Sequence, residues 1–178
     1  MTTPPTIAPL YAGWHLGNAD LIAVIGDLTP AQLGLPVERP IWASASHIAG
    51  ARVYWLCHVF NEPGAETTPF TDPNVGWEDD LTHPRSAAEL IGALASSWRI
   101  VERCLATWTP ESLSQEARRA RADGHVQIHT RQSVLMRLIT HDAFHIGEIS
   151  LVVGSNGLAG RTPNGAIDMW SGLARIAR

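Results

Sequence analysis

The chain has 178 residues and a mass of 19.3 kDa, which suits a single domain over residues 1–178 and excludes a second large one. All 13 basic residues are arginines, because the sequence contains no lysine; this excludes enzymes with a lysine nucleophile and Walker-type nucleotide hydrolases. The net charge of −4 also argues against nucleic acid as a partner, since such binding needs an excess of cations.

The first third of the chain predicts two amphipathic helices. Over residues 10–28, apolar residues recur every three, four or seven positions, as on one face of a helix. Residues 29–32, Thr-Pro-Ala-Gln, have the pattern of a capping box, which predicts a short new turn. A second helix is expected from about residue 41 to 60, and it must end before Pro63.

The segment 61–85 predicts a long loop, because it holds four prolines, two glycines and the acidic run Glu78-Asp79-Asp80 without a helical period. Loops of this length are either disordered or cover a site. Residues 86–89, Ser-Ala-Ala-Glu, form a second capping box and start a third helix that ends before Pro110.

The last third predicts a β-hairpin and the longest helix. Asp123-Gly124, within residues 118–128, is typical of a type I′ hairpin turn. A fourth helix is expected over about residues 130–153, with Gly154 at its end, and a short fifth one over 163–176. The fold class is therefore expected to be all-α: a four-helix bundle with a small hairpin between the third and fourth helices and a short C-terminal helix.

Cysteine usage and the N-terminus predict a cytoplasmic protein. Cys57 and Cys104 match no metal or redox spacing, so we expect two buried, reduced thiols and no cysteine nucleophile. The first basic residue is Arg39, and prolines interrupt the N-terminal segment, so no signal peptide is expected. No run of eighteen strongly apolar residues exists, so no membrane contact is expected.

The strongest local motif is His141-Asp142-Ala143-Phe144-His145. Histidines four positions apart on a helix point the same way and can both reach one ion at about 2.0–2.1 Å, although two hydrogen-bonded core histidines are the alternative. His47, near the start of the second helix, supplies a third imidazole if the two helices face each other. Three neutral imidazoles leave coordination positions open, as in catalytic sites; zinc is the default metal, with nickel, iron, copper or manganese as alternatives.

Two segments resemble the DinB-like superfamily: residues 46–56, SHIAGARVYWL, and residues 141–148, HDAFHIGE. The resemblance implies a four-helix bundle, often dimeric, in which one histidine of the second helix and an HxxxH pair of the last bundle helix bind a divalent metal. These ligands fall on His47, His141 and His145. The family includes thiol-dependent S-transferases, mycothiol-dependent maleylpyruvate isomerases and members without known activity, so the resemblance supports the metal more than the reaction.

Four polar residues near this motif have open roles. Asp142 either orients an imidazole or is an exposed acid, and the 100° step per helical residue favours exposure. Glu148 is the candidate for a fourth ligand or a catalytic base. His58 lies roughly 16 Å along the helix from the ligand position, so a structural or pocket-wall role is expected. For His15, a half-buried position is favoured over the pocket mouth.

Three further groups have less specific expectations. Solvent exposure is expected for His83, His125 and His129. We expect buried core positions, with one or two side chains lining a pocket instead, for Trp14, Trp42, Trp55 and Trp98. A solvated or dimer-facing patch, favoured over a site for the carboxylates of a thiol, is expected for Arg118, Arg119, Arg121, Arg131 and Arg137.

The leading hypothesis is a divalent-metal-dependent enzyme that activates a low-molecular-weight thiol or water, of the S-transferase or thiol-dependent isomerase type. It would act on a small molecule and form a homodimer. A bound cation would lower the pKa of the thiol and so make it nucleophilic. The alternatives are a non-catalytic, metal- or small-ligand-binding stress-response protein and a purely structural bundle without metal.

Overall fold

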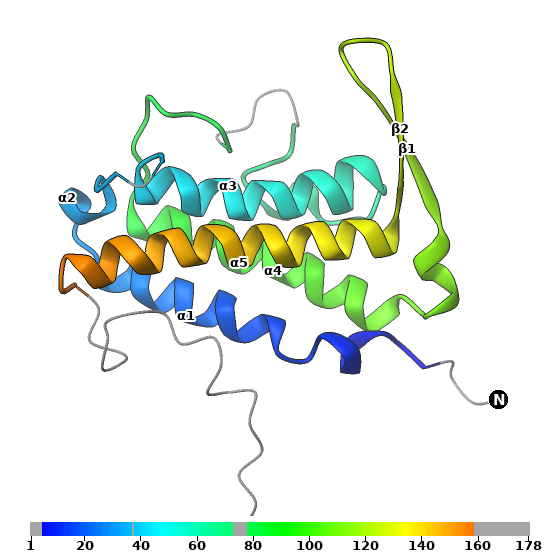
Figure 1. The fold of residues 1–178 in the computed structure, drawn as a ribbon, viewed down its shortest axis with the longest axis horizontal. Coiled ribbons are helices and arrows are strands. Elements are labelled where there is room, and N and C mark those ends of the chain that lie inside the picture. Colours follow the sequence, from blue (N-terminus) through cyan, green and yellow to red (C-terminus); the bar gives the residue numbers. More distant parts are fainter. Residues whose placement is uncertain (1–4, 37, 73–77, 159–178) are drawn as a thin grey trace, which may run out of the picture.

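Four long helices lie side by side along a common direction (Figure 1). The structure is a computed structural model that describes residues 5–36, 38–72 and 78–158. The long helices are α1 (Trp14–Asp27), α3 (Ile41–Val53), α4 (Ala87–Thr107) and α5 (Arg131–Ser155). Both α1 and α3 pack against α4 and α5, so α1 and α3 occupy opposite corners. The predicted all-α bundle is confirmed, and it places α3 directly beside α5.

Short elements extend or connect these helices. A π-helix, η2, continues α3 directly, so the predicted second helix changes its winding in its last third. A single-turn helix, α2, begins at the predicted capping box. The short elements are η1 (Ala8–Tyr11), α2 (Pro30–Leu33), η2 (Tyr54–Val59), η3 (Ala65–Thr67) and η4 (Glu111–Ser114).

The N-terminal prediction is wrong in one respect. The first helix was expected from residue 10, but α1 begins only at Trp14, after the 3-10 turn η1. Leu10 was expected on the buried face and is 73% exposed. The change of winding between η1 and α1 breaks the helical period that placed Leu10 on that face. The predicted helix over 163–176 lies outside the described residues.

Side-chain caps fix where the helices begin. In each cap a hydroxyl accepts the backbone N–H three residues on, while the side chain at that position accepts the N–H of the first residue. Both predicted capping boxes are present, and a third starts α5. The pairs are Thr29 with Gln32, Ser86 with Glu89, and Thr130 with Ser133.

The end of α5 differs from the prediction. Gly154 was expected to end the helix, but α5 runs to Ser155 and Gly157 adopts the left-handed conformation at φ 64°. The N–H of Leu158 donates to the carbonyl of Val153, and that of Gly157 to the carbonyl of Gly154. These two bonds form a Schellman motif, whose glycine lies three positions later than expected.

The hairpin of β1 (Glu116–Ala120) and β2 (Val126–Thr130) projects from the bundle just before α5 (Figure 1). The predicted type I′ turn is wrong, because it needs positive φ at both central residues and only Gly124 has it, at 82°. The Arg121 N–H donates to the His125 carbonyl, which leaves a three-residue loop. Asp123 stabilises this loop by accepting the His125 N–H.

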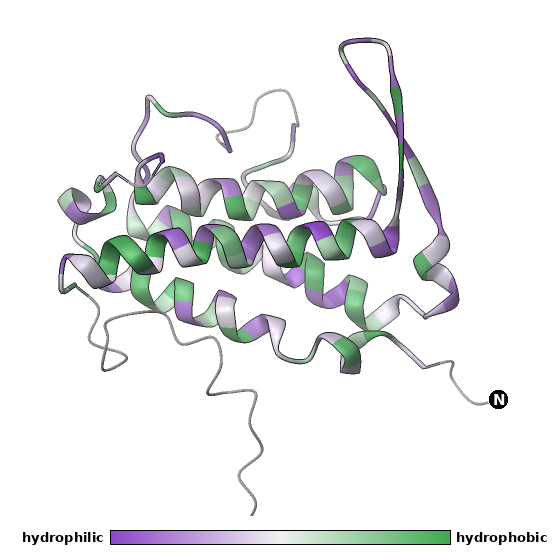
Figure 2. Cartoon of the chain, viewed as in Figure 1, coloured by the Kyte–Doolittle hydropathy of each residue, from purple (hydrophilic) through white to green (hydrophobic). Residues whose placement is uncertain are grey.

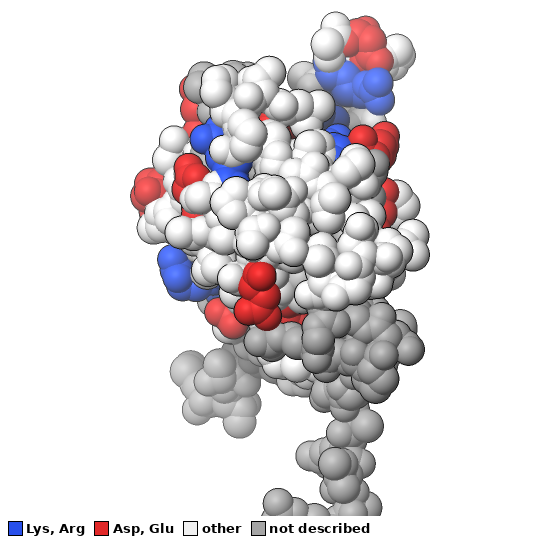
Figure 3. Space-filling view, turned by 90° about the vertical axis from the view of Figure 1, so that its left-hand side faces the viewer, with Lys and Arg blue, Asp and Glu red and all other residues white. Residues whose placement is uncertain are grey.

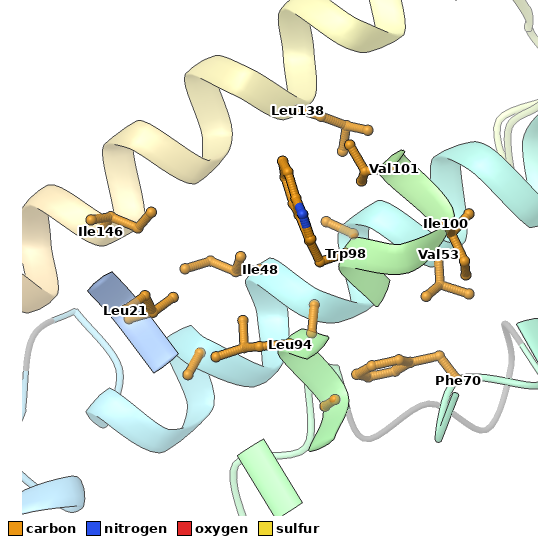
Figure 4. Close-up of a cluster of buried hydrophobic side chains, with 14 of the residues drawn as sticks. Leu21, Ile48, Val53, Phe70, Leu94, Trp98, Ile100, Val101, Leu138 and Ile146 are labelled. Atoms are coloured by element: carbon orange, nitrogen blue, oxygen red, sulfur yellow. The ribbon is translucent and has the colours of Figure 1, made fainter. Parts of the chain in front are cut away.

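The apolar faces of all four long helices meet in one core. Figure 2 shows apolar and polar bands alternating along the helices, and Figure 4 shows side chains of α1, α3, α4 and α5 directed into a shared interior. The residues there include Leu21, Ile48, Leu94, Trp98, Val101, Leu138 and Ile146, all buried. Burying each such side chain contributes about 1.5–3 kcal/mol, so this core holds α3 against α5.

The surface carries charges of both signs. On the end of the bundle shown in Figure 3, arginines and acidic residues are scattered among uncharged residues. None of the described helices combines the length and the apolar character that crossing a membrane requires.

Candidate metal centre

Three histidines converge between α3 and α5. His47 lies on α3, and His141 and His145 lie one turn apart on α5. Their ring centres are 4.7 Å (47 to 141), 5.1 Å (47 to 145) and 4.6 Å (141 to 145) apart. One nitrogen of each ring lies within 4.8 Å of the other two. The structure thus brings together the three residues that the sequence suggested, at a spacing that one divalent ion could bridge.

The protonation of this cluster suits a metal. Burial and, after it, the charges of the neighbouring imidazoles lower the pKa of His141 to about 3. Burial also lowers the pKa of His47. Both rings are therefore neutral at pH 7 and offer lone pairs. The Nδ1 of His141 is buried without a hydrogen-bond partner in the described part of the chain, a costly state that a bound cation could relieve.

Glu148 orients His145. Its Oε2 lies 2.7 Å from the Nδ1 of His145, and both side chains are largely buried. Because Nδ1–H donates to this carboxylate, Nε2 is left as the atom with a free lone pair. A carboxylate on the second ring nitrogen is common at metal-binding histidines, where it fixes the tautomer and raises the basicity of the ligand. The carboxylate is thus placed to support this ligand, and its suggested role as a fourth ligand or a base stays a prediction.

Asp142 is buried, so its expected exposure was wrong. Its Oδ2 accepts hydrogen bonds from the Nε and Nη2 of Arg52, at 3.1 and 2.7 Å, and from the Nε1 of Trp14 at 2.9 Å. The Nη1 of Arg52 donates to Asn18 at 2.6 Å. Arg52 is fully buried and Asp142 is 2% exposed, and burial raises the pKa of Asp142 against the effect of Arg52. The pair therefore joins α1, α3 and α5 beside the histidine cluster.

The end of the long loop covers the cluster. The Nδ1 of His47 lies 3.4 Å from a carboxylate oxygen of Glu78 and 3.2 Å from one of Asp79. A Cβ at Gly50 would lie 2.6 Å from the Cγ of Glu78, so the bare glycine on α3 allows this close approach. Burial and the charge of Asp79 raise the pKa of Glu78 to about 7.

These two acids were visible in the sequence as part of an acidic run, but nothing local assigned them to the site. The loop was expected either to be disordered or to cover a site, and the contacts of Glu78 and Asp79 with His47 agree with the second of these roles. Together with His47 they form a second group of atoms close enough to hold an ion. His47 is thus common to a three-histidine set and a mixed set. Imidazoles suit zinc and nickel, whereas carboxylates favour harder ions.

Three other histidines lie away from this centre. His15 was expected to be half-buried, but it is exposed on α1. The neighbouring Trp14 turns inward onto Trp98, so His15 faces solvent. His83 and His125 are exposed, as expected, at 76% and 83% of their side-chain surface.

His58 and His129 lie near a cavity beside the centre. His58 lines this cavity, and its Nε2 donates to the carbonyl of Phe70 at 3.0 Å, which confirms the pocket-wall alternative. His129 was expected in solvent, but its ring lies 4.8 Å from that of Trp55, and burial lowers its pKa. The hairpin leans on η2 and so shields one side of this ring. Trp55 also lines the cavity.

The five arginines near the hairpin have different environments. Arg131 pairs with Glu62 at 2.7 Å and lies over the Trp108 ring, and Arg121 pairs with Asp123 in the hairpin turn. Arg118 is exposed on β1. Only Arg119 and Arg137 line the cavity. The patch expected from the sequence is therefore divided, with two guanidinium groups directed at a pocket.

The two cysteines are free and buried, as expected. Burial raises the pKa of Cys57 to about 11 and that of Cys104 to about 12. Neither thiol ionises near pH 7, so neither is suited to act as a nucleophile.

The sequence model of the DinB superfamily matches residues 4–149. The match includes α1, α3 and α4, most of α5, and all three converging histidines. No curated protein and no solved structure matches the chain.

Proposed function

The chain belongs to the DinB superfamily, and from this premise we propose that it is a divalent-metal-dependent enzyme that activates a low-molecular-weight thiol. The observation that carries the proposal is the convergence of three largely buried imidazoles from two facing helices. His47, His141 and His145 would hold the ion, with zinc as the default. When bound, a cation with open coordination positions lowers the pKa of a thiol or water placed there.

The protein's own residues would prepare this site. Glu148 fixes the tautomer of His145 and so directs its Nε2 toward the centre. The Arg52–Asp142 pair holds α3 and α5 in register, which keeps His47 opposite the HxxxH pair. Glu78 closes over His47 and limits the access of water from that side.

In the proposed reaction, the sulfur of the thiol forms a bond to an electrophilic carbon of the second substrate. The bond from that carbon to its leaving group breaks, and the leaving group departs with the electron pair. The thiol proton passes to solvent. In an isomerisation of the same class, the sulfur adds to a double bond and is expelled again after rotation, so the thiol is regenerated.

Assembly and location complete the proposal. A homodimer is supported by large apolar residues on the outer face of α5, namely Met136, Phe144 and Leu151, which are 60–73% exposed. The free thiols of Cys57 and Cys104 support a reducing, cytoplasmic location.

The test is turnover of 1-chloro-2,4-dinitrobenzene with a set of low-molecular-weight thiols, together with metal analysis of protein purified without chelator. We expect about one ion per chain and thiol-dependent turnover that falls at least about 100-fold in His141→Ala, the scale expected when a metal ligand is lost. His15→Ala is the matched control, because this histidine is exposed on α1.

Equal turnover in the wild type and His141→Ala would refute the proposal. Stabilisation by metal without thiol-dependent turnover would favour a non-catalytic binding protein. No bound metal, and no stabilisation by added zinc or nickel, would favour a structural bundle.

A further inference from the structure

A cavity of about 640 Å³ lies beside the histidine cluster, in the size range of small-molecule sites. Tyr54, Trp55 and His58 line it, and all three belong to the π-helix η2. The wider π turn departs from the α-helical spacing of α3 and presents all three rings to one space. Single π turns within helices frequently mark functional sites.

The cavity continues toward the histidine cluster. Glu78 and Asp79 line it as well, and the same carboxylates approach the Nδ1 of His47. A ligand in the cavity therefore has one end near the centre.

The other end of the cavity is cationic and aromatic. Arg119 on β1 donates from Nε to the hydroxyl of Tyr54 at 2.6 Å, and from Nη1 to Gln127 at 3.1 Å. Its guanidinium carbon lies 5.7 Å from the ring centre of Trp55, and that of Arg137 lies 4.6 Å from the same ring. Two guanidinium groups are thus held against one indole by hydrogen bonds and cation–π contacts.

Neither of these charges is neutralised by an ion pair within the described residues. By contrast, Arg52 and Arg131 each have a carboxylate at 2.7 Å. Two fixed guanidinium groups that share a half-enclosed space repel each other, and an anion between them would remove that cost. Guanidinium groups recognise carboxylates through paired N–H donors.

We propose that this cavity binds the carboxylate of a small organic acid through Arg119 and Arg137, with an unsaturated or aromatic part of the ligand against Trp55. The charges set the orientation. The two guanidinium groups attract a carboxylate to their end and Asp79 repels it from the opposite end, so the rest of the ligand extends toward His47. This assignment deepens the proposed function and rests on it for the identity of the reacting centre; the binding test below does not depend on turnover.

The test is isothermal titration calorimetry with benzoate, and with benzamide as its neutral counterpart of equal shape. The full chain is used as purified and again after treatment with a chelator. We expect benzoate to bind with a dissociation constant of about 1 mM or below, at least about tenfold more tightly than benzamide. The two protein preparations should agree within about threefold, because the arginines and not the metal hold the anion.

The matched variants are Arg119→Met and Arg118→Met, since these neighbours on β1 differ in facing the cavity and solvent. We expect Arg119→Met to weaken benzoate binding at least about tenfold and Arg118→Met to leave it unchanged. Should Arg119→Met fail to fold, Arg137→Met decides the question with the same expected loss. Circular dichroism establishes folding in each case.

Four results would overturn the assignment. The first is that benzoate and benzamide bind equally, or that neither binds, and the second is that Arg119→Met and Arg118→Met bind benzoate alike. The third is that benzoate binding disappears after chelation, which would assign the anion to the metal. The fourth is that phenyl phosphate binds more tightly than benzoate, which would replace the carboxylate by a phosphate. If the wild-type chain binds benzoate as expected but shows no thiol-dependent turnover, only the proposed function is contradicted.

Discussion

The buried ion pair of Arg52 and Asp142 predicts that Asp142→Asn destabilises the protein strongly. Both side chains are nearly excluded from solvent, and the carboxylate accepts three hydrogen bonds. Removing the negative charge leaves the guanidinium buried and uncompensated, for which about 3–5 kcal/mol is typical. In a chain of this length, that loss corresponds to a decrease in Tm of about 6–20 °C.

The matched control is Asp123→Asn in the hairpin turn. Asp123 also pairs with an arginine, but both side chains of that pair are about half exposed. Such surface pairs contribute about 0–1 kcal/mol, so this variant should stay within about 1 kcal/mol of the wild type. The same chemical change should therefore have effects that differ by at least about 2 kcal/mol between the two sites.

Urea denaturation followed by circular dichroism, in the presence of a chelator, measures both free energies of unfolding without a contribution from bound metal. A loss below about 1 kcal/mol in Asp142→Asn, with an unchanged dependence on urea, would refute the reasoning. It would mean that water reaches the pair or that Arg52 finds another partner.

Three further predictions concern single groups. Glu148→Gln should weaken zinc binding by about 10–100-fold in a chelator competition, because His145 loses the acceptor that orients it; equal affinity would contradict that role. The pKa of His141 is lower in the folded chain, about 3, than its ordinary 6.5, so the unfolded state binds the extra proton first. The metal-free protein should therefore lose stability as the pH falls below about 6.5, by at most about 1 kcal/mol between pH 7 and 5.5 because partial exposure screens the effect. Urea denaturation should show a smaller loss of stability in His141→Gln than in the wild type. An equal loss in the two proteins would argue against this residue as the cause. Cys57 and Cys104 should react with a disulfide reagent at pH 7.5 at least about 100-fold more slowly in the folded chain than in urea, because burial raises both pKa values; rapid reaction of the folded chain would contradict their burial.

Local signals were enough to predict most of the fold. Capping boxes begin three helices, two of them at the predicted residues, because their side chains satisfy backbone N–H groups that no helix can satisfy internally. The four-residue spacing of His141 and His145 placed both on one face of α5 before any tertiary information. Only the pairing of α3 with α5 had to be assumed for His47, and the bundle provides it.

What the sequence could not predict depends on contacts between distant segments. Asp142 was expected outside because the angle along one helix was considered alone, whereas α5 packs against both α1 and α3. Arg52, within an otherwise apolar stretch of α3, was the available signal that a buried partner was needed. No local pattern places Glu78 over His47, or changes the winding of the second helix at Tyr54.

X-ray absorption spectroscopy of the zinc-loaded protein tests the central claim most directly, since it counts the imidazoles around the ion. The account predicts about three imidazole nitrogens at about 2.0–2.1 Å in the wild type, and fewer in His141→Ala. A coordination sphere of oxygen atoms alone, or an identical spectrum in that variant, would contradict it.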